Sequence, residues 1–449
     1  MGESEMNGMR SLMRRRLLGR KALVLVTAAM LTLSACGGGD DSAKREQGPV
    51  TLTLWSWVPD LQRQVDMFQQ AHPSIKVKLV NAGQGQEEYT KLRTSLKAGT
   101  GAPDVTQMEF QFLPSFRVTG DLVDISRYGA AEVKDDYVDW AWAQVSDGSA
   151  VYAVPWDSGP MGLLYREDIF RKHGIQVPTT WDEFAVSARK LHAADPKVYL
   201  TNFPPNEGGV ITALAWQAGA RPFESKGDTS VAVRLDDPAA MKMAQYWDGL
   251  IKEGVVSADP DFTDEWYRGL NTGRYAAWVT AAWGPLFLSG SAEKTKGKWR
   301  AAPLPQWSAG QAVSANWGGS TLAVTKQSKH AEQAAELAIW LMHDPQATKL
   351  YTTKQFLFPV LKSLLNSPEF VGQKFDFYGD QPVNQVFVKA ASEVDTGFQW
   401  SPFQDFVYTT MNDEFGKAVS GSQSLPDALR ATQRKATDYA RSQGFTVVQ

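Results

Sequence analysis

The residue types that most often carry catalysis occur in this 449-residue chain without a catalytic spacing. The five histidines are scattered and form no H-E-x-x-H zinc motif. No G-x-S-x-G nucleophile elbow and no Walker loop is present. Gly83 and Gly85 have the spacing of a dinucleotide loop but lack its third glycine. Glycoside hydrolysis stays open, because its two carboxylates are defined by a separation in space rather than in sequence.

The composition is that of a globular protein with a sizeable core. Hydrophobic residues make up 43% and aromatic residues 11% of the chain, and the formal net charge is −3. These values argue against disorder and against a basic nucleic-acid binder. The single cysteine, Cys36, excludes an intramolecular disulfide and an all-cysteine zinc site. We expect neither a metal ion nor a cofactor. Sixteen tryptophans outnumber thirteen tyrosines, which is an unusual balance.

The N-terminus has the features of an export signal. Basic residues precede an uncharged run, Ala22–Leu33, whose 12 residues are too few to span a bilayer. Leu33-Ser34-Ala35-Cys36 resembles a bacterial lipobox, in which the cysteine is diacylated and the signal is removed just before it. We therefore expect a lipoprotein signal peptide at 1–35, exported by the general or the twin-arginine route, and a flexible lipid-anchored tether at 36–49. The protein would then lie at the cell surface, held to the outer face of the cytoplasmic membrane by this lipid alone.

The mature part of the chain alternates strand and helix patterns. Strand patterns at 50–57, 75–80 and 103–110 are separated by amphipathic helices near 61–72 and 89–98. Helices between strands imply βαβ crossovers, so the sequence predicts an α/β fold with mostly parallel sheets.

The same rhythm continues to the end of the chain. Thr180 and Glu183 fit a capping box that starts a helix. A long helix from Ala331 is expected to end at Asp344-Pro345, and the part from Asn384 onward is helical in pattern. Further strands are predicted at 151–156, 161–165, 275–280 and 321–325.

Several segments resemble family 1 extracellular solute-binding proteins. Thr51–Phe68 resembles the N-terminus of that family, and Ala102–Glu109 its second helix-to-strand junction. The most specific stretch is Trp317–Thr325, followed by Ala331–Met342 and then Phe358-Pro359-Val360. The order of these segments covers essentially Val50 to the C-terminus.

The resemblance implies a two-lobed periplasmic-binding-protein-like fold with a ligand cleft between the lobes. The first lobe would comprise 50–157 and 317–357, and the second 158–316 and 358–449. The chain would cross between lobes near Pro155–Gly159, Ala315–Gly319 and Phe356–Pro359. Such proteins are not enzymes: they capture a sugar or oligosaccharide by hinge closure and deliver it to the permease subunits of an ABC importer. A monomer that binds no nucleic acid is expected.

Sugar rings present an apolar face of C–H groups and a rim of hydroxyls. Aromatic planes suit the face, and acids and amides satisfy the rim. Trp317, beside two glycines at the second crossing, is the strongest candidate. Trp283 precedes Gly-Pro, whereas the family's cleft tryptophan usually follows it, so the stacking residue stays open between Trp278 and Trp283. The full set of candidate carbohydrate-binding residues is Trp317, Trp283, Glu109, Trp55, Gln84, Asp157, Trp156, Trp278 and Trp400.

Two alternatives remain open. A surface lipoprotein glycoside hydrolase would use a carboxylate pair, for which Glu109 and Asp157 are the candidates. A family 1 protein could instead bind a glycerol phosphate ester or a metal. A phosphate would require clustered arginine or lysine, and iron would require paired tyrosines; neither is prominent among the candidate residues.

Overall fold

A computed structural model describes residues 49–227, 229–353, 355 and 357–448. The expected signal peptide at 1–35, Cys36 and the expected tether up to residue 48 lie outside the described residues, as does Phe356 of the expected third crossing. Within the described ranges, no helix combines the length and the apolar character that crossing a membrane requires.

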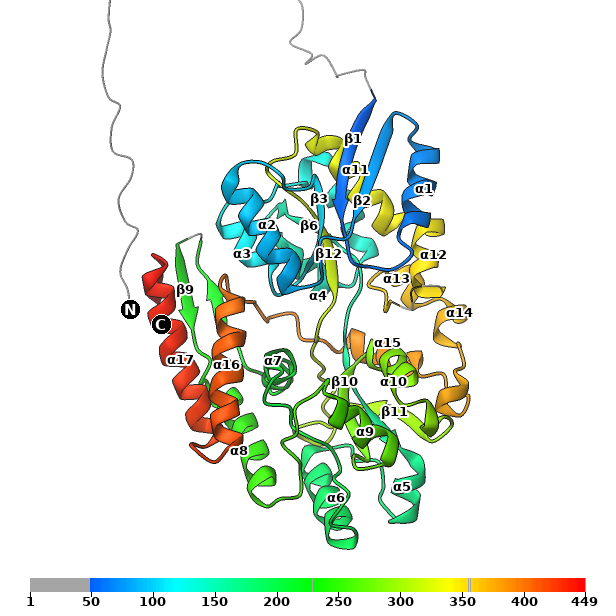
Figure 1. Ribbon diagram of the computed structural model, residues 1–449, viewed down its shortest axis with the longest axis vertical. Coiled ribbons are helices and arrows are strands. Elements are labelled where there is room, and N and C mark those ends of the chain that lie inside the picture. The colour runs from blue at the N-terminus through cyan, green and yellow to red at the C-terminus, as the bar shows by residue number, and fades with distance from the viewer. Residues whose placement is uncertain (1–48, 228, 354, 356, 449) are drawn as a thin grey trace, which may run out of the picture. The chain divides into compact units, whose positions relative to one another are not determined.

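The first sheet is formed by strands from two distant parts of the chain. Its order is β2-β1-β3-β12-β6. β1 pairs in parallel with both β2 and β3, while β12 runs antiparallel to β3 and β6 (Figure 1). The expected βαβ crossovers therefore hold for the first three strands, and the later β12 is inserted in the opposite direction. The strand bounds are β1 Val50–Trp55, β2 Ile75–Val80, β3 Val105–Glu109, β6 Ala153–Pro155 and β12 Ser320–Val324.

Helices around this sheet also come from both parts of the chain. Helix α1 buries Val65 and Phe68, which are three residues apart and therefore share a face. Helix α2 ends at Gly99, whose left-handed backbone (φ 74°) closes the helix. Helix α11 contacts β12, β6 and α1, so residues far apart in sequence form one core. The helix bounds are α1 Gln62–Ala71, α2 Gln86–Ala98, α3 Leu113–Val118, α4 Asp139–Val145, α11 Ala331–His343 and α12 Pro345–Thr353.

The second sheet differs from the expected parallel pairing. Its order is β10-β7-β11, and both neighbouring pairs are antiparallel. More than a hundred residues separate β7 from β10 in the chain, so no single βαβ crossover sets their direction. The strand bounds are β7 Met161–Arg166, β10 Ala277–Ala281 and β11 Trp299–Pro303.

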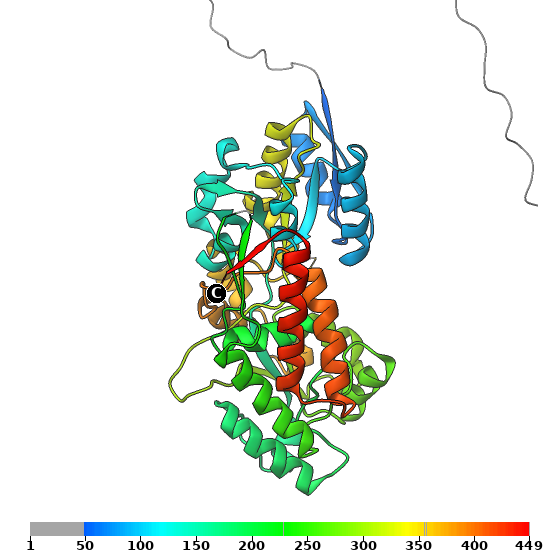
Figure 2. The ribbon, with the colours of Figure 1, turned by 90° about the vertical axis from the view of Figure 1, so that its left-hand side faces the viewer.

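The remaining helices vary in length from 4 residues in α13 to 18 in α17. The capping box of α6 is confirmed: Glu183 N–H donates to Thr180 Oγ1 at 3.2 Å and the Glu183 carboxylate accepts from the Thr180 N–H. Helices α16 and α17 lie side by side (Figure 2). The helix bounds are α5 Glu167–Lys172, α6 Trp181–Ala194, α7 Gly208–Gln217, α8 Pro238–Lys252, α9 Asp264–Thr272, α10 Gly284–Ser291, α13 Lys362–Leu365, α14 Pro368–Val371, α15 Asn384–Ser392, α16 Gln404–Val419 and α17 Leu425–Ser442.

A third, small sheet includes the last described residues, which form a strand although the part from Asn384 onward is helical in pattern. The final strand β13 pairs in parallel with β9, which also pairs with β8. Residues 446–448 form a strand because they pair with the edge of β9. The remaining strand bounds are β4 Ser146–Asp147, β5 Ala150–Val151, β8 Phe223–Ser225, β9 Ser230–Val233 and β13 Thr446–Val448.

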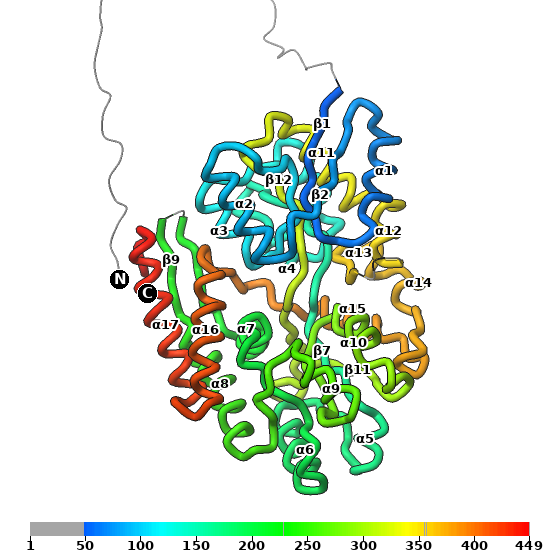
Figure 3. Tube along the Cα trace, in the orientation of Figure 1, coloured from blue at the N-terminus to red at the C-terminus, as the bar shows by residue number. Residues whose placement is uncertain are grey.

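Three chain segments connect the first sheet and its helices to the second (Figure 3). In chain order they contain Gly159, Trp317 and Phe358, and they are called the first, second and third connecting segments. They run beside one another and share backbone hydrogen bonds. Trp317 N–H donates to the Gly159 carbonyl at 2.8 Å, and Ser158 N–H donates to the Phe358 carbonyl at 2.9 Å. A Cβ at position 159 would overlap the Trp317 carbonyl oxygen, so this approach requires glycine.

Candidate ligand-binding site

Trp317 and Trp283 meet beside the second connecting segment. Their ring centroids are 4.7 Å apart at 73°, and Trp283 Nε1–H donates to the Trp317 carbonyl at 2.9 Å. Trp317 is 8% exposed. Its ring lies on the N-terminus of α7, where a Cβ on Gly209 would be 2.5 Å from Trp317 Nε1. Glycine in this first turn therefore lets the indole reach the helix backbone.

Glu109 is the last residue of β3, and its charge acts on Glu207 at the start of α7. The Tyr89 hydroxyl donates to Glu109 Oε2 at 3.1 Å and accepts from the Glu109 N–H at 2.9 Å. Burial raises the pKa of Glu109 to about 7. The Tyr89 ring also packs edge-on against Trp57, with centroids 6.2 Å apart. The half-buried Trp57 thus lies close to Glu109.

Asp157 lies in the first connecting segment. Its Oδ1 accepts the Ser320 N–H at 2.8 Å, which joins this segment to the start of β12. Burial raises the pKa of Asp157 to about 6. Ser320 is also the β-ladder partner of Glu109, so both carboxylates lie at the same end of the first sheet.

Two further carboxylates in this region were not predicted from the sequence. Glu207 immediately precedes α7, and its carboxylate has no hydrogen-bond or ion-pair partner among the described residues. Burial, together with the charges of Asp261 and Glu109, raises its pKa to about 7. Asp261 is buried, accepts from Asn202 Nδ2 at 2.6 Å, and also has its pKa raised to about 7 by burial. The sequence feature that could have indicated Glu207 is its position directly before an apolar helix, 208–217, that begins with glycine.

Tyr408 of α16 completes this part of the site. A Cβ on Gly208 would lie 2.8 Å from Tyr408 Cδ1, so the tyrosine ring packs directly on the start of α7. Burial raises the pKa of Tyr408 well above its ordinary value, and the charges of Glu109 and Glu207 raise it further. Residues from β3, α7 and α16 therefore face one another here.

The four carboxylates lack a basic counterpart. Within the described ranges, no lysine or arginine forms an ion pair with Glu109, Asp157, Glu207 or Asp261. Buried carboxylates normally have a charged or hydrogen-bonding partner. The half-buried Trp283 and the buried Trp317, together with carboxylates whose hydrogen-bond donors are all neutral, form a surface suited to a polar molecule with apolar faces. Among the residues that the structure describes, no group of three or more histidine, cysteine, aspartate or glutamate side chains could hold a metal ion.

The other predicted residues are divided between core and surface. Trp156, Trp278 and Trp400 are 0%, 2% and 4% exposed. Trp278 packs on Trp266 with centroids 5.1 Å apart and lies beneath Trp283, which is the more exposed of these two. Trp55 is half-buried at the end of β1, and Gln84 is exposed in the loop before α2. The structure thus brings Trp317, Trp283, Asp157 and Glu109 together. Trp278 contacts this group from the core, through Trp283, and the remaining four predicted residues are not part of it.

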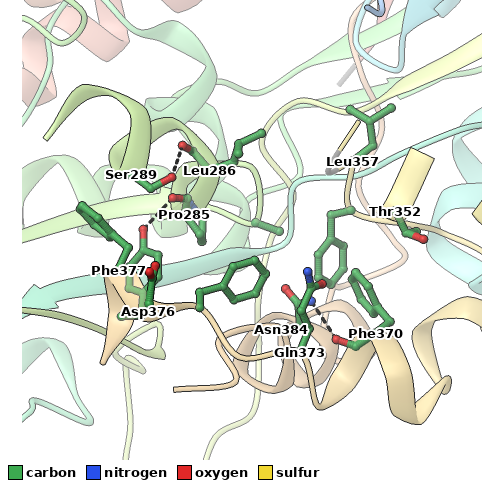
Figure 4. A pocket seen from close by; sticks show the side chains of 14 residues that line it. Pro285, Leu286, Ser289, Thr352, Leu357, Phe370, Gln373, Asp376, Phe377 and Asn384 are labelled. Atoms are coloured by element: carbon green, nitrogen blue, oxygen red, sulfur yellow. Dashed lines mark hydrogen bonds between the residues drawn. The ribbon is translucent and has the colours of Figure 1, made fainter. Parts of the chain in front are cut away.

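A separate apolar cavity of about 230 Å³ lies on another face of α10 (Figure 4). Leu286 and Pro285 line it from α10, and Phe370 and Phe377 line it from the segments around α14. None of the four carboxylates described above lines this cavity.

The fold and the site define the class of the protein. Two sheets joined by three adjacent segments, with acids and indoles where these segments meet, are typical of two-lobed binding proteins. Residues 54–348 match the bacterial extracellular solute-binding proteins. The chain belongs to this family.

Several characterised proteins are similar over most of their length. The ABC-transporter-associated binding protein of B. animalis subsp. lactis Bl-04, solved with β-1,6-galactobiose, is 31% identical with a TM-score of 0.76, covering 89% of this chain and 99% of that one. The galacto-N-biose/lacto-N-biose I-binding protein of Bifidobacterium longum is 27% identical with a TM-score of 0.78, covering 90% and 100%. The arabinooligosaccharide-binding protein of Bacillus subtilis is 25% identical over 339 residues, 72% and 76% of the two chains.

Proposed function

We propose that this protein captures a sugar or oligosaccharide and delivers it to the permease of an ABC importer without altering it chemically. The observation that carries the proposal is the contact between Trp283 and Trp317 in the same region as four carboxylates that form no ion pair with a lysine or arginine among the described residues. Indole faces suit the C–H face of a sugar, and carboxylates accept hydrogen bonds from its hydroxyls. The names of the three similar proteins, which bind galactobiose, lacto-N-biose or arabinooligosaccharides, support the same class of ligand.

The charge of the site argues against an anionic ligand. A phosphate ester requires arginine or lysine to neutralise it, whereas the Trp317 ring lies on the first turn of α7, which directly follows Glu207. A neutral sugar avoids this repulsion.

The protein acts by closing two lobes around its ligand, as a monomer. The first lobe comprises 50–157 and 317–357, and the second comprises 158–316 and 358–449. The three connecting segments lie side by side, which supports this division, because adjacent short segments can act as one hinge about which the two lobes rotate.

Lipid attachment holds the protein to the outer face of the cytoplasmic membrane. The lipobox at Leu33–Cys36 supports this anchor, with residues 36–49 as the tether. Capture would then take place within tether length of the permease.

The test is a ligand panel read by melting temperature and tryptophan fluorescence. Galacto-, arabino- and maltooligosaccharides would each be added to the purified chain. Binding to the folded state alone raises its stability by about 2.7 kcal/mol at a hundredfold excess over Kd. We expect one sugar series to raise the melting temperature, and Trp317→Ala to abolish that rise.

Trp307→Phe serves as the matched control, because Trp307 packs on Trp181 and lies outside the candidate site. It should keep the full response. No response to any sugar would contradict the proposal, and release of shorter sugars by the wild-type protein would identify a hydrolase instead.

A further inference from the structure

A chain of aromatic rings continues outward from Trp317 and Trp283. Phe262 lies next to both, with its ring centroid 6.4 Å from Trp317 and 6.3 Å from Trp283. Phe287 of α10 follows at 5.5 Å from Phe262, and Tyr267 of α9 lies 5.9 Å from Phe287. The rings run from the nearly buried Trp317 to Phe287, which is 37% exposed.

Phe262 occupies an unfavourable backbone conformation. Its φ of 63° is left-handed, and the other two non-glycine residues with positive φ in the described ranges are aspartates, which tolerate that region better. A bulky residue held in this region requires support from its surroundings and often marks a functional site.

The turn that carries Phe262 is fixed by side chains next to the candidate site. Asp261 N–H donates to Asn206 Oδ1 at 3.0 Å, and Asn206 Nδ2 donates back to the Asp261 carbonyl at 3.1 Å. Asn206 directly precedes Glu207. The same short segment therefore positions both a carboxylate of the site and the ring of Phe262.

Phe287 remains exposed although its ring contacts the rings of Phe262 and Trp283. Among the described residues, the exposed large hydrophobic side chains are Val186, Leu286 and Phe287, and two of these three lie on α10. They face different surroundings: Phe287 contacts the rings, whereas Leu286 lines the separate cavity (Figure 4). An exposed aromatic ring continuous with a binding surface is a common feature of ligand sites.

We propose that Phe262, Phe287 and Tyr267 form an outer subsite for a further saccharide unit of an oligosaccharide whose first units lie at Trp283 and Trp317. This inference rests on the proposed function and adds that the ligand has at least three units. The outer unit places its C–H face on the exposed Phe287 ring, at the edge of the site where a longer chain extends toward solvent.

The test compares ligand lengths in the full-length chain. Isothermal titration with galacto- and arabinooligosaccharides of two, three and four units gives Kd for each length. In the wild type, Kd should fall by about tenfold from two to three units in the series that binds, as expected for one added aromatic contact. Phe287→Ala should remove this gain, so that the ratio of the two Kd values approaches one.

Leu286→Ala is the matched control. It removes a more exposed apolar side chain from the same helix without touching the rings, and it should keep the tenfold ratio. Phe262→Leu keeps apolar volume at the strained turn but removes the ring. It should reduce the ratio of the Kd values for two and three units. The melting temperature of the free variant is measured in parallel to detect any loss of stability.

The outcomes separate this inference from the proposed function. If sugars bind but Kd does not change with length, or if Phe287→Ala keeps the wild-type ratio, the outer subsite is overturned and the proposed function stands. If no sugar of any length binds, both are overturned.

Discussion

The Glu207 carboxyl group combines burial with neighbours of the same charge. Its ordinary pKa of 4.5 rises to about 7 in the folded protein because burial disfavours the charged form. The unfolded chain therefore loses this proton at lower pH than the folded protein does. Between the two values the folded state binds more protons, so the free energy of unfolding falls as pH rises from about 4.5 to about 7, and the Glu207 contribution is constant above that.

We predict that Glu207→Gln stabilises the ligand-free protein more at pH 8 than at pH 5. The amide has no charge to desolvate, and the gain at pH 8 should be about 1 kcal/mol after allowance for partial solvent screening. Calorimetric melting at the two pH values measures it. An equal change at both pH values would contradict the assignment.

Glu183→Gln offers a control of opposite sign. Hydrogen bonds from the Thr179 backbone N–H and hydroxyl lower the pKa of Glu183 in the folded protein. That stabilisation is present above the ordinary pKa and is lost as pH falls through the lowered one. The substitution should therefore lower the melting temperature about equally at pH 8 and at pH 5, because both lie above the ordinary pKa of 4.5, and by less at pH 3.

At the scale of elements, α2 and α16 are linked although they pack on different parts of the protein. Arg93 Nη2 of α2 donates to Asp405 Oδ2 of α16 at 2.6 Å, and Phe112 packs edge-on against Tyr408 at 6.5 Å. Helix α16 otherwise contacts α17 and α7. Under the proposed division, this ion pair joins the two lobes away from the connecting segments.

We predict that Arg93→Ala weakens ligand binding by a few-fold while lowering stability by less than about 1 kcal/mol, as is usual for a partly exposed ion pair. The loss arises because the pair forms only where the lobes meet. Scattering of the ligand-free variant should give a larger radius of gyration than the wild type.

Lys91→Ala removes an ion pair to Glu87, four residues away in α2, and a hydrogen bond to the Ala82 carbonyl. Neither joins α2 to α16, so ligand affinity and the radius of gyration should stay unchanged. Equal effects of the two substitutions would mean that α2 itself, rather than its link to α16, was disturbed.

At the scale of the whole molecule, function depends on where the protein is held. We predict that Cys36→Ser releases the protein from membranes into the medium, because the proposed lipid is its only attachment. Fractionation of cells followed by immunoblotting measures this. The melting temperature and ligand response of the released protein should equal those of the wild type. Membrane association of the variant would show that the lipobox interpretation is wrong.

Local features of this fold could be read from the sequence because they depend on neighbours along the chain. The capping box at Thr180 and Glu183 and the end of α11 at Asp344-Pro345 each follow from a few adjacent residues. The order of motifs from Val50 onward also predicted the family, which the match over 54–348 confirms.

Other features were decided only by tertiary structure. The antiparallel second sheet and the pairing of β13 with β9 depend on segments that meet from far apart in the chain. The sequence does not distinguish a tryptophan that is buried in the core, such as Trp278, from one that lies beside the connecting segments, such as Trp283. Glu207 likewise becomes notable only when folding places it near Asp261 and Glu109. Local sequence patterns thus indicated many of the elements and the family, while long-range packing decided the remaining strands and which side chains share the site, because burial and proximity are properties of the whole fold.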